Sequence, residues 1–272
     1  MARVSVQLDP VPETLLWTLW HRAVEAKRRD RVLDDPLAVE LVDRIDFPFA
    51  ERFGDGERLS QWQALRASCF DNAIRRFLSG HPGDTVVALG EGLETQLWRV
   101  DDGRVRWVSV DLPEVIEIRR ELLPPHERNR LVAASVLERD WLGTVTPGTD
   151  VLVTAQGVLM YLAPADVHSL IAQCADRFRR GAMVFDAVPS WLVERGRRGG
   201  LRSETDYVPP TWTWGLDRDE ERRLAALPHV ASLTALRLPR GRGLAHGVLL
   251  PLAARAPAVR RRLLSILMAR FR

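Results

Sequence analysis

Two spacings of apolar residues divide the chain into helical and extended segments. Apolar side chains recur every three or four positions over residues 12–28, 58–79 and 167–178, which is the spacing of amphipathic helices. Between them lie short apolar runs of strand length, at 85–89, 106–110, 130–134, 151–155 and 182–185. Strands that alternate with helices predict right-handed crossovers and a parallel sheet with helices on both faces.

The alternation stops after residue 187. Residues 188–216 are rich in Pro, Gly, Arg and Trp, and we predict a lid or insertion there. Residues 230–238 and 244–252, joined by a Pro-Arg-Gly-Arg-Gly turn, have the pattern of a terminal antiparallel hairpin. The expected fold is therefore a single doubly wound, Rossmann-like α/β domain. Its parts are a helical cap (1–80), a core (84–187), an acceptor lid (188–229), a hairpin (230–252) and a basic amphipathic tail (253–272).

The composition argues against several classes of binding partner for this domain. The formal net charge is only +3, from 39 basic and 36 acidic residues, which is too balanced to indicate nucleic acid. Apolar runs are all shorter than the roughly 18 residues of a membrane span, and Asp9, Pro10 and Pro12 rule out a signal peptide. The lone Cys69 and Cys174 are typical of a reducing compartment and not of a metal site. We expect a cytoplasmic protein without a metal, a nucleic-acid partner or a membrane span.

The first candidate site follows the strand at 85–89. That strand ends at Gly90-Glu91-Gly92, a turn in which the backbone can approach a ligand closely. Asp111 ends the next strand, where a carboxylate can accept hydrogen bonds from ribose hydroxyls. In the alternative interpretation the glycines only make a tight turn and Asp111 only caps a helix. A dinucleotide fingerprint requires Gly or Ala where Thr95 stands, so the site favours S-adenosylmethionine (SAM) over a nicotinamide cofactor.

Arg66 is the second candidate. It lies in the middle of an apolar helical stripe formed by Leu59, Trp62, Cys69, Phe70 and Ala73. A guanidinium in that position needs an anion, because it stays charged and is costly to bury unpaired. The methionine carboxylate of SAM would satisfy it, and so would an internal ion pair with one of the many acids, for example Glu91 or Glu94. The pattern leaves both interpretations open.

A third set of residues follows the strand at 151–155. Gln156 and Tyr161 are expected to face the cofactor cleft, because ligands in doubly wound sheets bind beyond the carboxyl ends of the strands. If SAM donates its methyl group, a phenol or alcohol that accepts it would benefit from a general base, for which Tyr161, His168 and His246 are the candidates. A carboxylate acceptor needs none, so no base is assigned.

The aromatic segment 207–215 is a candidate wall for the acceptor. Tyr207, Trp212 and Trp214 combine large apolar area with rigidity conferred by two neighbouring prolines. The competing interpretation is a loop that packs on the core.

Five motifs together resemble one known family, the leucine carboxyl methyltransferases, and especially their bacterial O-methyltransferase branch found in polyketide and mycobacterial contexts. The resemblance runs from about residue 10 to 252. In chain order the motifs are Pro12-Glu13-Thr14, Asp35-Pro36, Leu89-Gly90-Glu91-Gly92-Leu93-Glu94-Thr95, Val110-Asp111-Leu112-Pro113 and Gly157-Val158-Leu159-Met160-Tyr161-Leu162.

The resemblance implies a class I SAM-dependent O-methyltransferase that acts on a carboxylate or hydroxyl of a small, polyketide-like molecule. It places the SAM carboxylate at Arg66, helped by an N-terminal basic residue that is either Arg22 or Arg28. The cofactor-binding residues that it implies are Arg66, Gly90, Glu91, Gly92, Asp111, Leu112, Val136, Leu137 and Gln156.

The chain departs from the family pattern at several of these positions. Glu91 replaces a small residue, Glu94 the usual aspartate, and Gln96 a common arginine. Val136 stands where an aspartate often contacts adenine, and Gln156 stands where a glutamate is usual. The last two changes favour an alternative in which the protein binds its ligand without catalysis. A nicotinamide-dependent oxidoreductase is disfavoured by Thr95. No oligomeric state follows from the sequence.

Overall fold

The protein is described here by a computed structural model, which covers residues 3–6, 9–80, 83–146, 150–199, 205 and 207–272. The strands are β1 (Val4–Ser5), β2 (Ile45–Asp46), β3 (Thr85–Leu89), β4 (Arg106–Asp111), β5 (Asn129–Ala133), β6 (Val151–Ala155), β7 (Ala182–Ala187), β8 (Val230–Leu236) and β9 (Ser265–Phe271). The α-helices are α1 (Pro10–Ala26), α2 (Pro36–Arg44), α3 (Phe49–Phe53), α4 (Glu57–Gly80), α5 (Gln96–Val100), α6 (Pro113–Leu122), α7 (Pro164–Arg177), α8 (Ser190–Arg197), α9 (Arg218–Ala225), α10 (Leu250–Ala253) and α11 (Pro257–Arg260).

A seven-stranded sheet organises the described part of the chain, in the order β5-β4-β3-β6-β7-β9-β8. The five strands from β5 to β7 pair in parallel, whereas β9 is antiparallel to both of its neighbours. The chain leaves β3 toward β4 on one side and later returns to β6 on the other. This reversal is the topological switch point at which doubly wound sheets bind ligands, and it confirms the predicted fold class.

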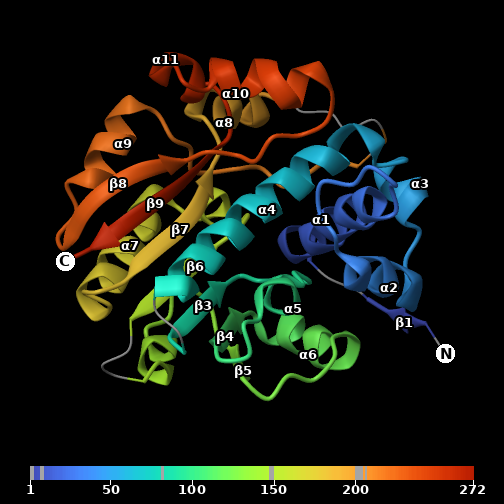
Figure 1. The fold of residues 1–272 in the computed structure, drawn as a ribbon, viewed down its shortest axis with the longest axis horizontal. Coiled ribbons are helices and arrows are strands. Elements are labelled where there is room, and N and C mark those ends of the chain that lie inside the picture. The colour runs from blue at the N-terminus through green and yellow to red at the C-terminus, as the bar shows by residue number, and fades with distance from the viewer. Residues whose placement is uncertain (1–2, 7–8, 81–82, 147–149, 200–204, 206) are drawn as a thin grey trace.

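Both faces of the sheet are covered, which explains why its strands are continuous apolar runs. Val87 and Leu89 of β3 pack with Ile171 of α7, whereas Val86 and Ala88 pack on the opposite face against α4. Figure 1 shows α4 crossing the front of the sheet, with α1, α2 and α3 gathered to the right of α4. These N-terminal helices form their own apolar cluster with α6.

The C-terminal region differs from the prediction. Residues 244–252 do not form a strand: a π-helical turn over Ala245–Leu249 continues into α10. Pro251 lacks the N–H that a central strand must donate. The partner of β8 is β9, which lies in the segment expected to be a basic tail and is inserted between β7 and β8. Its apolar run Ser265–Phe271 is largely buried, so that expectation was wrong.

The predicted lid divides into two parts. Residues 200–204 and 206 lie outside the described residues. The stretch from Trp214 onward packs on the sheet, since Trp214, Leu216 and Leu224 belong to the buried core. The backbone N–H groups of Thr213 and Trp214 both donate to the carbonyl of Met160, at 2.8 and 3.2 Å. Only α8 and the residues before Trp214 remain beside the cavity described next.

Candidate active site

A cavity of about 740 Å³ opens at the carboxyl ends of β3, β4, β5 and β6, within the volume range of small-molecule sites. Eleven of the residues proposed from the sequence line it: Arg66, Gly90, Glu91, Gly92, Asp111, Leu112, Val136, Gln156, Tyr161, Tyr207 and Trp212. The register of the sheet brings them together, because Leu89 of β3 pairs with Val110 on one side and with Ala155 on the other.

The turn after β3 requires glycine. Gly90 and Gly92 have φ of 57° and 55°, values that residues with a Cβ rarely adopt. A Cβ on Gly90 would also lie 2.5 Å from Cγ2 of Val158. The loops after β3 and β6 therefore approach each other closely, and their backbones form one wall of the cavity.

Asp111 is held firmly at the end of β4. Its Oδ2 accepts a hydrogen bond from Gly92 N at 2.7 Å, and its Oδ1 accepts one from its neighbour Leu112 N at 2.8 Å. Burial raises the pKa of this carboxyl, and the two backbone donors oppose that shift. Asp111 thus shapes the glycine turn and also lines the cavity.

Arg66 projects from α4 into the same cavity and pairs with Asp186 of β7. Its Nε lies 3.5 Å from Asp186 Oδ2, and both side chains are buried. The other oxygen of Asp186 accepts from Gly157 N at 2.7 Å. Burial raises the pKa of Asp186, and the charge of Arg66 and the Gly157 donor oppose it. Arg66 therefore forms an internal ion pair, one of the two alternatives that the sequence left open, and its partner is Asp186 and neither of the two examples, Glu91 and Glu94.

Two further features suit Arg66 to binding an anionic group of a ligand in the cavity. The terminal nitrogens of Arg66 lie under the loop after β6, where a Cβ on Gly157 would be 3.1 Å from Nη2. No hydrogen bond from those nitrogens is found within the described residues, although Arg66 lines the cavity. A bidentate anion would complete this guanidinium.

Gln156 lines the cavity and has a buried acceptor without a partner among the described residues. Its Nε2 donates to Glu94 Oε1 at 2.8 Å, whereas its buried Oε1 accepts no hydrogen bond from the described residues. The uncharged amide suits this position, because a glutamate would place a second carboxylate beside Glu94. A ligand with an N–H or O–H donor would satisfy the orphaned oxygen.

Glu94 also belongs to a buried charge network below the cavity. Arg22 of α1 donates to Glu94 and to Asp35 at 2.9 Å each. Arg99 of α5 pairs with Asp35 at 2.9 Å and with Asp71 at 2.8 Å. The terminal nitrogens of Arg22 therefore join the N-terminal helices to the loop after β3, and Arg22 does not line the cavity. Its rival Arg28 is exposed and pairs with Asp30.

Glu91, the acid between the two glycines, is also paired. Glu91 forms an ion pair with Arg119 of α6 at 2.8 Å, with both side chains buried. Burial raises the pKa of Glu91, and Arg119 opposes the rise. The charge that makes this turn unusual for the family is thus neutralised from the helix behind it.

Aromatic and apolar side chains line the remainder of the cavity. Tyr161 lies between Trp212 and Thr14, and burial raises the pKa of its hydroxyl. Tyr207 contacts Phe53 edge-on, with ring centroids 4.9 Å apart. This end of the cavity provides apolar walls with few polar groups, which suits an aromatic acceptor.

Three predicted site residues lie elsewhere. Trp214 is buried in the core and donates from Nε1 to Glu220 Oε1 at 2.7 Å, so its assignment to the acceptor wall was wrong. His246 pairs with Gln61 at 3.0 Å and does not line the cavity. Leu137 is exposed beside Val136, which does line it. The alternative base His168 pairs with Glu220 at 2.7 Å, also outside the cavity.

Several cavity residues were not recognised from the sequence. Thr14, Thr18 and His21 of α1 line the cavity. Their spacing of four and three positions marks one helical face, but the stronger apolar stripe of α1 concealed it. Asp186 was also missed, although an acid inside the apolar run of β7 was a usable signal.

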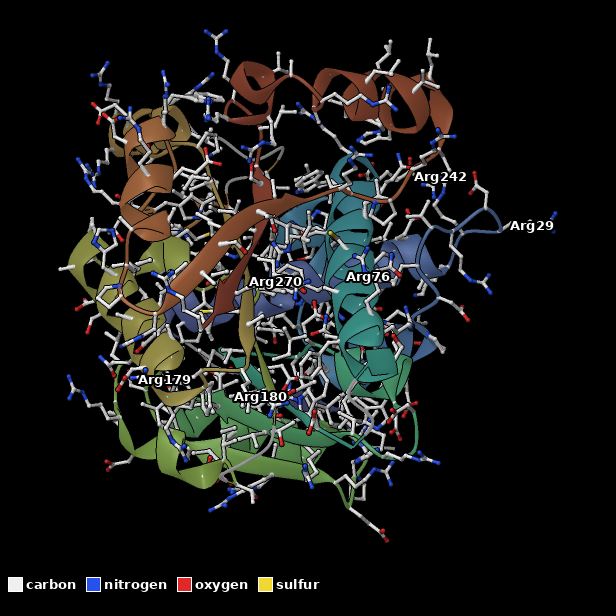
Figure 2. All side chains as sticks on the ribbon, turned by 60° about the vertical axis from the view of Figure 1, so that its left-hand side comes forward. Arg29, Arg76, Arg179, Arg180, Arg242 and Arg270 are labelled. Carbon is white, nitrogen blue, oxygen red and sulfur yellow. The ribbon has the colours of Figure 1, made fainter. Side chains whose placement is uncertain are left out.

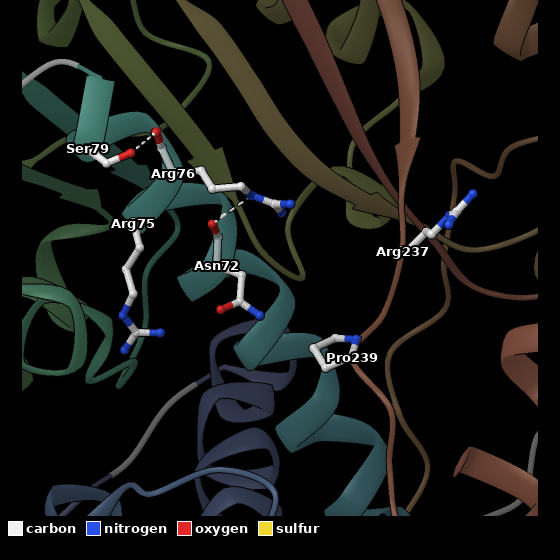
Figure 3. Close-up of a pocket in the computed structure, with 6 residues that line it drawn as sticks. All are labelled: Asn72, Arg75, Arg76, Ser79, Arg237 and Pro239. Carbon is white, nitrogen blue, oxygen red and sulfur yellow. Dashed lines mark hydrogen bonds between the residues drawn. The ribbon is translucent and has the colours of Figure 1, made fainter. Parts of the chain in front are cut away.

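A second, smaller hollow of about 380 Å³ lies at the surface and is lined by Asn72, Arg75, Arg76, Ser79, Arg237 and Pro239. Figure 3 shows Arg75 and Arg237 pointing in opposite directions, so the guanidinium groups do not converge on one ligand. Arg75 donates to the carbonyl of Arg99 and Arg76 to that of Asn72. In the described ranges there is also no cluster of three or more His, Cys, Asp or Glu side chains suited to a metal, and no helix able to cross a membrane.

Comparisons with known proteins show the family to which the chain belongs. A family model for leucine carboxyl methyltransferases matches residues 15–175, which include Arg66, Gly90, Asp111 and Gln156. The chain is 35% identical over 226 residues to the tetracenomycin polyketide synthesis O-methyltransferase TcmP of Streptomyces glaucescens, with 82% of each chain covered. It is 30% identical over 240 residues to the SAM-dependent methyltransferase dpfgK of Gibberella zeae, covering 80% of this chain and 79% of that relative.

Among solved structures, human N-acetylserotonin methyltransferase in complex with SAM aligns with a TM-score of 0.48 at 14% identity, covering 98% of this chain and 72% of that chain. The assignment itself rests on the family model and on the two relatives. The chain therefore belongs to the leucine carboxyl methyltransferase family and is a SAM-dependent methyltransferase.

Proposed function

We propose that the cavity binds SAM along the loops after β3, β4 and β6 and transfers its methyl group to an oxygen of an apolar small molecule. The observation that carries the proposal is that Arg66 of α4, Gln156 after β6 and Asp111 at the end of β4 line one cavity, and that Gln156 has a buried amide oxygen without a partner among the described residues. Arg66 would hold the amino-acid carboxylate, Gln156 Oε1 would accept from the ammonium, and Asp111 would accept from the ribose. SAM supplies an electrophilic methyl group on a sulfonium.

The residues of the chain contribute mainly alignment and exclusion of water. A displacement at the methyl carbon needs the acceptor oxygen in line with the leaving sulfur, and a dry site suppresses competing solvation. The walls formed by Met160, Tyr161, Tyr207 and Trp212 would provide both. A carboxylate acceptor is already ionised at neutral pH, whereas a hydroxyl acceptor would place its oxygen near Tyr161.

Asp111→Ala tests the cofactor part of this proposal. Loss of a buried hydrogen-bonding carboxylate is expected to weaken SAM binding by about 1.5–3 kcal/mol, or roughly ten- to 150-fold. Isothermal titration calorimetry with SAM and with S-adenosylhomocysteine measures it. Glu114→Ala removes the next acid along the chain, which is exposed, and should bind both as wild type does. Wild-type affinity in Asp111→Ala would refute the assignment of the ribose site.

Trp212→Ala tests the acceptor part. The indole lines the cavity, so we expect methyl transfer from labelled SAM to aromatic carboxylic acids and phenols to lose at least tenfold in kcat/KM, with SAM affinity within twofold of wild type. Trp98→Ala, which changes a tryptophan outside the cavity lining, is the matched control. A panel of carboxylate and hydroxyl acceptors on one aromatic scaffold separates the two oxygen nucleophiles. A matched loss of SAM binding would place Trp212 in the cofactor site instead.

A further inference from the structure

The connection between β8 and β9 exposes an unusual number of apolar side chains. Twelve large apolar residues are exposed in the described part of the chain, and six of them lie between residues 244 and 259. Leu244, Val248, Leu249 and Leu252 follow one another at the spacing of a helical face, with exposures of 68, 45, 55 and 50%. This face of the helical segment points to solvent instead of the core.

The same connection is strongly cationic. Residues 237–264 contain seven arginines and no aspartate or glutamate. Arg242 is neutralised by Glu25, and Arg260 and Arg261 both pair with Glu221. Arg255 and Arg262, by contrast, are exposed and pair with no acidic side chain among the described residues. Cationic side chains therefore flank the apolar face.

Helix α8 extends this surface. Trp191 is 50% exposed and its Nε1 donates to the carbonyl of Arg262 at 3.2 Å, which joins α8 to the end of the connection. Figure 1 shows α8, α10 and α11 side by side along one edge of the molecule. We call the surface made by Trp191, Leu244, Val248, Leu249, Leu252, Arg255 and Arg262 the apolar–arginine face.

We propose that the apolar–arginine face docks on an anionic phospholipid bilayer. Interfacial helices combine leucine and tryptophan on one side with arginine beside them, and they insert the apolar side chains at the boundary between headgroups and acyl chains. Each arginine near an anionic surface adds attraction. The neighbours of this face, Leu192 and Leu264, line the cavity, so docking would bring the acceptor end of the cavity near a lipid phase.

A second copy of the chain suits this face less well. A symmetric dimer would place the same surface of each copy against the other, and the exposed Arg255 and Arg262 of both copies would then share one interface. Like charges brought together at an interface are unfavourable. The charge of the face is instead complementary to anionic headgroups.

Vesicle flotation with the full chain tests the proposal. We expect binding to vesicles of phosphatidylcholine mixed with phosphatidylglycerol, weaker binding as salt rises, and no binding to phosphatidylcholine alone. Leu244→Gln, Leu249→Gln and Leu252→Gln combined should reduce partitioning more than tenfold, and Arg255→Gln with Arg262→Gln about thirtyfold. None of these side chains lines the cavity, so SAM affinity and thermal unfolding should match wild type and show that the variants are folded.

Matched controls use the same chemistry elsewhere on the surface. Val208→Gln changes an apolar residue that is 75% exposed. Arg179→Gln with Arg180→Gln removes two exposed arginines that pair with Asp176 and Asp150 and lie distant from Arg242 in Figure 2. Both should bind vesicles as wild type does. Failure of the wild type to bind anionic vesicles overturns the proposal. If only the arginine variant loses vesicle binding, the face binds an acidic macromolecule instead. If the wild type self-associates and the leucine variant does not, the face binds a second copy. Either result overturns the bilayer proposal.

Discussion

Asp35→Ala is expected to lower the free energy of unfolding by about 3–5 kcal/mol, because it removes a buried carboxylate that pairs with two buried arginines. Asp35 Oδ2 accepts from both Arg22 and Arg99 at 2.9 Å, and its Oδ1 accepts from Thr95 at 2.6 Å. These contacts tie α1, α2 and α5 to the loop after β3. Urea denaturation followed by circular dichroism measures the change.

The neighbouring acid provides the control. Asp34 is exposed and pairs only at the surface with Arg31, so Asp34→Ala should cost less than about 1 kcal/mol. Burial alone would raise the pKa of Asp35, but Arg22 and Arg99 outweigh it and the pKa lies below its ordinary value. The stabilisation is therefore present above about pH 4, the pKa of an unfolded aspartate, and is lost only as the pH falls through the lower folded value. Equal stability of the two variants at pH 7 would contradict this account of the network.

Arg66→Met is expected to weaken SAM binding about a hundredfold while changing the affinity for 5′-methylthioadenosine by only a few fold. The second ligand lacks the amino-acid carboxylate, so it does not use the bidentate contact that the guanidinium would provide. Methionine keeps the apolar stem of the side chain within the stripe of α4. Calorimetric titration of both ligands against wild type and variant gives the comparison, and Arg76→Met, an exposed arginine on the same helix, is the control.

The ion pair of Arg66 with Asp186 requires a second variant. Removing Arg66 alone leaves a fully buried carboxylate, which would take up a proton or destabilise the fold. Asp186→Asn combined with Arg66→Met removes both charges with little change in shape. We expect the double variant to recover stability without recovering SAM affinity. If Arg66→Met lowers the affinities for SAM and for 5′-methylthioadenosine equally, Arg66 stabilises the fold and does not bind the carboxylate of SAM.

Much of the site was predictable from short-range pattern. A glycine turn after an apolar strand, an acid after the next strand and an arginine within an apolar helical stripe are local signals, and the structure brings Gly90, Asp111 and Arg66 to one cavity. Aromatic character alone was a weaker guide. Trp212 and Trp214 look alike in sequence, but the tertiary structure places Trp212 at the cavity and Trp214 in the core.

The C-terminal region shows a similar limit. An apolar run of four to eight residues fits a buried strand or a helical turn equally well, and the choice depends on hydrogen-bonding partners far away in the chain. The open edge of β7 is completed by Ser265–Phe271 and not by residues 244–252. Arginines around the true strand gave it the composition of a tail, although its own residues are mostly buried.

By itself the sequence determined the doubly wound fold, the glycine turn with its acid, and the requirement that Arg66 meet an anion, because periodicity and backbone chemistry act over a few residues. Only the tertiary structure decided that the anion within the protein is Asp186, that Arg22 belongs to a buried charge network, and that one oxygen of Gln156 has no partner among the described residues. The physical reason is that charges and hydrogen bonds choose partners by distance in space. The parallel register of β3, β6 and β7 sets those distances.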